Sequence, residues 1–238
     1  MLIVIGGSLL AVLGHRLWDI NNMTDTNKTA AEAEHRARIE RAARESTRAL
    51  RASATTDPAA LTALIGKYTE APVITYEAAH KKFTAEVEMS TTYDTVHLLT
   101  VGVERIVSCE LFTYTLGPDR AWRVDVATRG TATCLPGRQV ADLARRAKSI
   151  LENLNGPLTT VRQAERVLDQ AGPPGRLTVR SMVTDTRTTT VSALLTDMTG
   201  AVDQCYNFSL SHHASGDRMS VTSMPTAAAL CGIRRLAG

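Results

Sequence analysis

The sequence predicts an α+β protein in which an N-terminal transmembrane helix precedes a tandem duplication of a helix–helix–four-stranded antiparallel sheet unit. Three observations lead to this prediction: an apolar N-terminal segment, a pattern that recurs after about 96 residues, and one cysteine pair in each copy. We expect a membrane anchor over residues 1–20, a tether over 21–35, a first α+β unit over 36–137 and a second over 138–238.

The anchor is expected because residues 1–13 are apolar and uncharged, and Trp18 would suit the membrane interface. The segment to Trp18 is slightly shorter than the roughly 20 residues that span a bilayer as a helix. It has neither the basic start nor the clear cleavage site of a signal peptide. We therefore expect an uncleaved single-pass anchor in the cell membrane, with the bulk of the chain extracytoplasmic. A buried N-terminal helix is the alternative.

The duplication is visible when the chain is compared with itself. Residues 97–100 align with 193–196, and Cys109–Thr113 aligns with Cys205–Ser209. Ala132–Cys134 aligns with Ala229–Cys231 after a one-residue change of offset. Because the matches keep their order, we expect two copies of one structural unit.

Each copy is expected to begin with two helices. In the first helix of copy one, apolar and small residues share one side at a 3.6-residue period. These are Ile39, Ala42, Ala43, Ser46, Ala49 and Leu50. The corresponding helix of copy two has its stripe over residues 140–154. The second helices are expected after Asp57-Pro58, a favourable cap and first-turn pair, and after Pro157.

The period then changes to that of strands. Residues 83–89 and 177–183 alternate between apolar and polar side chains. In copy one we expect a turn near 91–94, strands around 96–101 and 106–116, a turn at 117–119, and a last strand from Trp122. The expected arrangement is an antiparallel meander with the helices on one face.

Four cysteines allow three pairings, and the duplication favours Cys109 with Cys134 and Cys205 with Cys231. Two alternatives are a zinc site and four free buried cysteines. No pair has the short spacing typical of zinc ligands. Disulfides would place the chain in an oxidising compartment, in agreement with the anchor.

The sequence contains no nucleotide-binding glycine loop, metalloprotease motif or nucleophile elbow, so we expect no enzyme, no metal and no cofactor. The net charge of +3 and the 4% aromatic content also do not suggest a nucleic-acid partner. The first helix carries four arginines opposite its apolar side. These candidate contacts to an anionic surface are Arg41, Arg44, Arg48 and Arg51. An ordinary solvated helix face is the alternative.

The turn and strand Gly117-Pro-Asp-Arg-Ala-Trp-Arg-Val124, together with the element order, resembles NTF2-like domains. The anchor followed by such units resembles membrane-tethered VirB8-type proteins of conjugation and type IV secretion machines, and Mce-associated membrane proteins. The resemblance implies a non-catalytic assembly role.

We therefore expect a membrane-anchored extracytoplasmic scaffold or assembly protein. Its expected partners are other envelope or secretion- and conjugation-machine proteins, and it could form a homo-oligomer. The alternative is an extracytoplasmic sensor or carrier that binds a small ligand between its sheet and helices.

Overall fold

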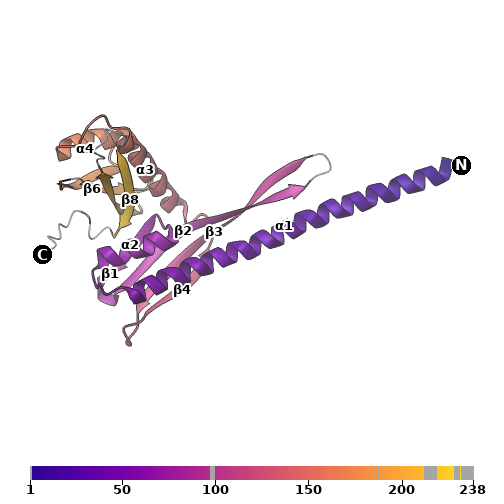
Figure 1. Ribbon diagram of the computed structural model, residues 1–238, viewed down its shortest axis with the longest axis horizontal. Helices are drawn as coiled ribbons and strands as arrows, with labels where there is room; N and C mark the ends of the chain where they lie inside the picture. The colour runs from indigo at the N-terminus through magenta and orange to yellow at the C-terminus, as the bar shows by residue number, and fades with distance from the viewer. Residues whose placement is uncertain (1, 97–99, 187, 212–218, 228–230, 232–238) are drawn as a thin grey trace. The chain divides into compact units, whose positions relative to one another are not determined.

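The computed structural model describes residues 2–96, 100–186, 188–211, 219–227 and 231, and describes side chains from residue 22 onward. Two four-stranded antiparallel sheets are present, each preceded by two helices (Figure 1). The first sheet has the strand order β1-β2-β3-β4, and the second has β5-β6-β7-β8. Both sheets are therefore simple meanders, as the sequence predicted.

The first copy contains α1 (Leu2–Ala52), α2 (Pro58–Thr69), β1 (Val73–Glu77), β2 (Lys82–Val96), β3 (Val101–Leu116) and β4 (Trp122–Arg129). A 3-10 turn, η1 (Ala78–His80), joins β1 to β2. The predicted cap of the second helix is confirmed, because the Asp57 carboxylate accepts the Ala59 N–H at 3.2 Å and Pro58 lies in the first turn. Pro58 fits there because the first helical N–H has no partner within the helix.

The second copy contains α3 (Leu135–Glu152), α4 (Val161–Leu168), β5 (Leu177–Thr184), β6 (Thr188–Thr196), β7 (Asp203–Ser211) and β8 (Ser220–Thr226). The 3-10 turn η2 (Asp169–Ala171) extends α4. The helix α4 begins after Thr160, whose hydroxyl accepts the Gln163 N–H, and not directly after Pro157. The boundary expected at 137/138 falls inside the first turn of α3.

Four details of the first copy and of the segment before it differ from the sequence prediction. The expected turn near 91–94 lies inside β2, and the strand expected at 96–101 is absent from the described residues, since Val96 ends β2 and Val101 begins β3. The short strand β1 was not predicted. The expected tether over 21–35 belongs to the continuous helix α1, in which Ala31 and His35 are buried.

The chain divides into two compact units whose limits differ from those of the two copies. One contains residues 1–41 and 89–108, and the other contains 42–88 and 109–238. The second unit thus holds α1 from Ala42 onward, the helices α2, α3 and α4, the whole second sheet, and the first sheet without residues 89–108.

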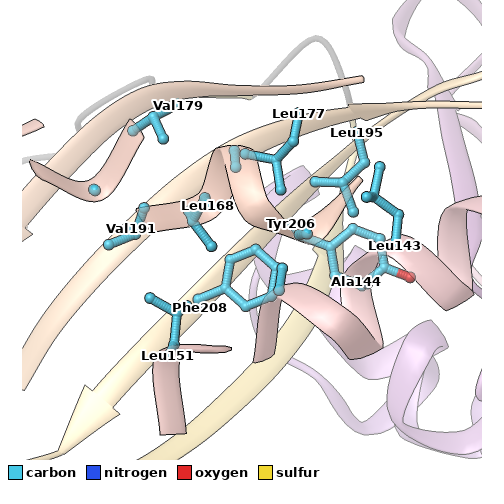
Figure 2. Packing of buried hydrophobic residues seen from close by; sticks show 14 of the residues in the cluster. Leu143, Ala144, Leu151, Leu168, Leu177, Val179, Val191, Leu195, Tyr206 and Phe208 are labelled. Carbon is cyan, nitrogen blue, oxygen red and sulfur yellow. The ribbon is translucent and has the colours of Figure 1, made fainter. Parts of the chain in front are cut away.

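A hydrophobic core cluster of the second unit lies between α3, α4 and the second sheet, where α3 packs against β6, β7 and β8. In Figure 2, Phe208 and Tyr206 of β7 face Leu143, Ala144 and Leu151 of α3. The stripe predicted over 140–154 is thus confirmed as the buried face of α3. Val73 of β1 also belongs to this cluster, so the first copy contributes to the core of the second.

No helix in the described part of the chain is long and apolar enough to cross a membrane. The side chains of the expected anchor, residues 1–20, lie outside the described ones.

Candidate functional site: an open hairpin edge and a cationic cavity

Two features of the described residues can carry a binding function. The first is the distal part of the β2–β3 hairpin, Met89–Val96 and Val101–Ser108, which we call the distal hairpin. The second is a cavity at the end of α1. They belong to different compact units, so each is described by itself.

The β2 side of the distal hairpin is covered by polar side chains of α1. Arg38 donates to the Ser90 carbonyl at 2.6 Å, and Asn27 donates to the Asp94 carbonyl at 2.9 Å. The Val96 N–H donates to the Thr24 hydroxyl at 3.0 Å. Unpaired backbone groups of an edge strand are therefore satisfied by the helix, which protects that edge from pairing with another strand.

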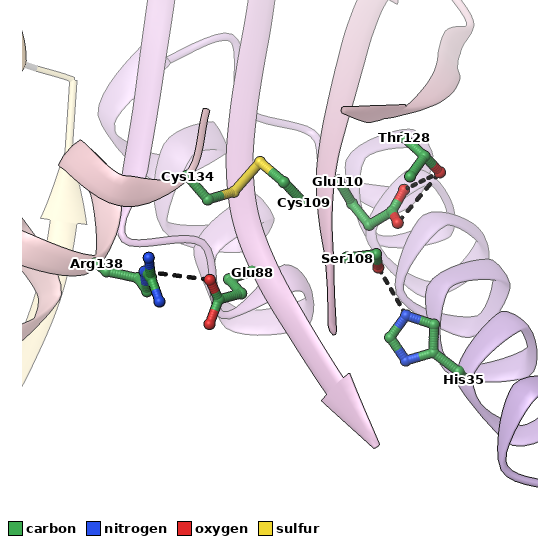
Figure 3. The surroundings of a disulfide bond; sticks show 8 residues. All are labelled: His35, Glu88, Ser108, Cys109, Glu110, Thr128, Cys134 and Arg138. Carbon is green, nitrogen blue, oxygen red and sulfur yellow. Dashed lines mark hydrogen bonds and ion pairs between the residues drawn. A yellow bond between two sulfur atoms is a disulfide. The ribbon is translucent and has the colours of Figure 1, made fainter. Parts of the chain in front are cut away.

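A buried histidine fixes the helix to the face of the same hairpin. His35 Nδ1 lies 3.0 Å from the Thr91 hydroxyl, and Nε2 lies 2.6 Å from the Ser108 hydroxyl (Figure 3). Because a hydroxyl can donate or accept, both ring nitrogens are satisfied in either tautomer. His35 thus joins α1 to both strands of the hairpin.

The β3 side of the distal hairpin is different. The pairing of β3 with β4 begins at Cys109, which lies opposite Arg129, so Val101–Ser108 has no β4 partner. Val101 and Val103 are each 69% exposed on this segment. An open strand edge with exposed β-branched residues can accept a further strand through main-chain hydrogen bonds. This edge was not predicted, because the sequence pattern divides β2 and β3 into shorter strands.

The cavity has a volume of about 640 Å³ and lies between the end of α1, the start of α2 and the first sheet. Its apolar wall includes Phe83 and Trp122, whose ring centroids lie 5.6 Å apart, and Tyr76, which stacks on Phe83 at 4.5 Å. Three basic residues line the same cavity, namely Arg51, Lys81 and Arg120. None of the described residues that line it is acidic.

The predicted arginine face is exposed along α1. This is expected because buried residues at helical spacing occupy the opposite side of the helix. Arg44, Arg48 and Arg51 line a groove of about 630 Å³ together with Arg123 of β4. Arg123 also forms an ion pair with Asp119 at 2.9 Å. Arg41 belongs to the other compact unit and does not line this groove. The contact of the four predicted arginines of α1 with an anionic surface stays a prediction.

Both predicted disulfides are present. Cys109 is joined to Cys134 and Cys205 to Cys231, which leaves no free cysteine among the described residues. Cys134 directly precedes α3, so its disulfide links β3 to the first helix of the second copy (Figure 3). Arg138 in the first turn of that helix forms an ion pair with Glu88 of β2 at 3.2 Å.

Glu86 lies close to Cys109 and Cys134, and three such side chains could in principle hold a metal ion. Burial raises the pKa of the Glu86 carboxyl. Both sulfurs are in a disulfide and provide no thiolate, so this cluster does not offer the ligand set of a zinc site.

No protein-family model and no curated protein matches the sequence. Among solved structures, the chain is similar to one described as an "Ntf2 like protein involved in plasmid conjugation", at 10% sequence identity. The similarity covers 64% of this chain and 73% of that chain, with a TM-score of 0.17. A TM-score this low carries no argument about function.

Proposed function

We propose that this chain is an extracytoplasmic scaffold or assembly protein, anchored in the cell membrane by residues 1–20. Its distal hairpin binds an extended strand of another envelope protein, such as a component of a secretion or conjugation machine. The proposal includes no catalytic activity.

The observation that carries the proposal is the asymmetry of the distal hairpin. Side chains of α1 satisfy the backbone of β2 at Ser90, Asp94 and Val96. The β3 segment Val101–Ser108, in contrast, pairs on its outer side with no strand of the described part of the chain. Proteins usually protect such edges with charges, bulges or a covering element. One edge is protected here, so the exposed valines on the other edge favour a binding surface.

The two disulfides support the extracytoplasmic part of the proposal, since disulfides persist in oxidising compartments.

The proposal is tested by placing a photo-crosslinking amino acid at Val103 in the full chain, expressed in its native membrane. The matched control position is Met198, which is 53% exposed in a turn with no strand edge. We expect one discrete adduct with another envelope protein at Val103 and none at Met198. The double variant Val101→Lys/Val103→Lys should abolish complex formation, because lysines on an edge strand oppose further pairing. Equal labelling at both positions would contradict the proposal.

A second function is favoured by the cavity. Small-ligand sites are typically concave, mostly apolar and supplied with a few convergent polar groups, and about 300–1,000 Å³ in volume. The cavity at the end of α1 has these properties. A sensor or carrier function could therefore coexist with assembly. Measurement of ligand binding to the full chain tests this sensor or carrier function.

A further inference from the structure

The cavity at the end of α1 carries charge of one sign only. Arg51, Lys81 and Arg120 line it without an acidic residue among the lining side chains, and none of the three forms an ion pair within the described part of the chain. A cluster of cations with low-dielectric walls focuses a positive potential. Such a site repels cations and attracts anions.

Arg51 is held in place at this cavity. Its Nε donates to the Trp122 carbonyl at 2.8 Å, and this contact is partly buried. The bond uses one of the five guanidinium N–H donors, and the terminal amino groups remain for a ligand. A guanidinium can bind a carboxylate through two parallel hydrogen bonds, which makes it well suited to an oxyanion.

The two other cations occupy unusual backbone positions. Lys81 has φ 47° and Arg120 has φ 58°, and only one further non-glycine residue with positive φ, Glu70, is found in the described ranges. This left-handed conformation favours glycine and costs other residues on the order of 1 kcal/mol. Both positions thus carry a long basic side chain where glycine would be less strained, which favours a role for the charge.

The aromatic wall supplies an apolar surface beside the cations. Tyr76, Phe83 and Trp122 come from three strands of one sheet and are in ring contact in that order. Phe83 and Trp122 are buried, while Tyr76 is half-buried. Because Phe83 is fully buried, a flat apolar ligand would gain area burial and offset stacking mainly on Tyr76, whose ring stacks on Phe83.

We infer that this cavity binds a small organic anion with an apolar body, whose carboxylate contacts Arg51, Lys81 and Arg120 while its body lies against Tyr76 and the exposed edge of Trp122. This inference rests on the second function proposed above and adds the chemical class of the ligand. It does not depend on the distal hairpin.

The test uses three probes with the same ring system and different charge: naphthalene-2-carboxylate, 2-naphthylmethanol and 2-naphthylmethylammonium. Binding to the full chain in nonionic detergent is measured by isothermal titration calorimetry. We expect one carboxylate per chain, with an affinity that falls as salt is raised, at least tenfold weaker binding of the alcohol, and no binding of the ammonium probe.

The variants Lys81→Gly and Arg120→Gly separate binding from folding. Glycine fits a positive φ, so each variant should keep the melting temperature or raise it slightly while binding the carboxylate about 5- to 10-fold more weakly. The matched control is Glu70→Gly, which relieves the same backbone conformation at a residue that does not line this cavity and should leave the Kd unchanged.

Equal binding of the carboxylate and the alcohol would overturn the anion inference while leaving a ligand cavity in place. Failure of all three probes to bind would overturn both the inference and the second function. Unchanged affinity in both Lys81→Gly and Arg120→Gly would place the bound anion elsewhere and would also overturn the inference.

Discussion

The side-chain amide of Gln204 links the two sheets through the backbone of Ile74. Gln204 Oε1 accepts the Ile74 N–H at 2.8 Å, and both residues are fully buried. The Gln204 Nε2 donates to the carbonyls of Cys205 and Thr226. One side chain from β7 therefore satisfies a backbone donor of β1 in the first copy and a carbonyl of β8 in the second.

The variant Gln204→Leu should destabilise the protein by about 2–3 kcal/mol, because it leaves the Ile74 N–H and the Thr226 carbonyl buried without these partners. The control is Gln139→Leu, which removes one exposed hydrogen bond to the Met198 N–H and should cost less than about 1 kcal/mol. Urea denaturation measures both values. Equal costs would show that Gln204 does not couple the copies.

The link through Gln204 could not be predicted from the sequence. Gln204 lies one residue before Cys205, in a strand that the duplication predicted correctly. The sequence pattern of one copy, however, does not indicate which of its residues contact the other copy. The same limit applies to Tyr206, whose hydroxyl donates to the Pro72 carbonyl at 3.0 Å. Periodicity determines which face of a strand is apolar, whereas contacts between copies depend on tertiary packing.

The order of two helices followed by an antiparallel sheet, the buried face of α3, the cap at Asp57 and both disulfides were predicted, because each depends on the local sequence or on the repeat. The strands β2 and β3 were divided wrongly. Polar residues such as Thr92 and Asp94 suggested a turn, but here α1 supplies hydrogen bonds to the strand's edge. The residues that line the cavity could not be predicted as one site, because Arg51, Lys81 and Arg120 are distant in sequence and share no spacing pattern.

The variant His35→Ala should loosen the distal hairpin without unfolding the rest of the chain. It removes the hydrogen bonds to Thr91 and Ser108, which join α1 to both strands. We expect faster amide hydrogen exchange over residues 89–108 and little change in the second sheet. The control is His80→Ala, since His80 is exposed and contacts Glu77 locally. Uniformly faster exchange in His35→Ala would contradict a local role.

Tyr114 should make stability fall in alkali. Burial raises the pKa of its phenol to about 12, although the hydrogen bond with Ser46 at 2.8 Å acts in the opposite direction. A folded-state pKa above the unfolded value of about 10 gives a stabilisation that is complete below pH 10 and is lost between about pH 10 and 12. Burial also raises the pKa of Tyr206.

The variant Tyr114→Phe should therefore lose about 1 kcal/mol at neutral pH, through the lost hydrogen bond, and show a smaller fall in stability above pH 10. Denaturation curves between pH 8 and 11.5 measure this difference. An unchanged alkaline slope would mean that Tyr114 is accessible to hydroxide in the folded protein.

The variants Cys134→Ala and Cys231→Ala should each lower stability by about 3 kcal/mol in the chain-entropy model, because the bridged residues are 25 and 26 positions apart. Cys134→Ala should in addition loosen the start of α3, since Cys134 directly precedes that helix. Thermal denaturation of each variant, with and without a reductant, gives the cost of each bridge. A variant as stable as the wild type would show that its bridge does not constrain the unfolded chain.

The proposed assembly function depends on a location outside the cytoplasm. Non-reducing peptide mapping tests this location most directly. The protein is isolated from its native cells, and its thiols are blocked at lysis. We predict two linked peptide pairs, Cys109 with Cys134 and Cys205 with Cys231, and no pair that joins the copies. Four blocked, free thiols would contradict an oxidising compartment and with it the extracytoplasmic scaffold.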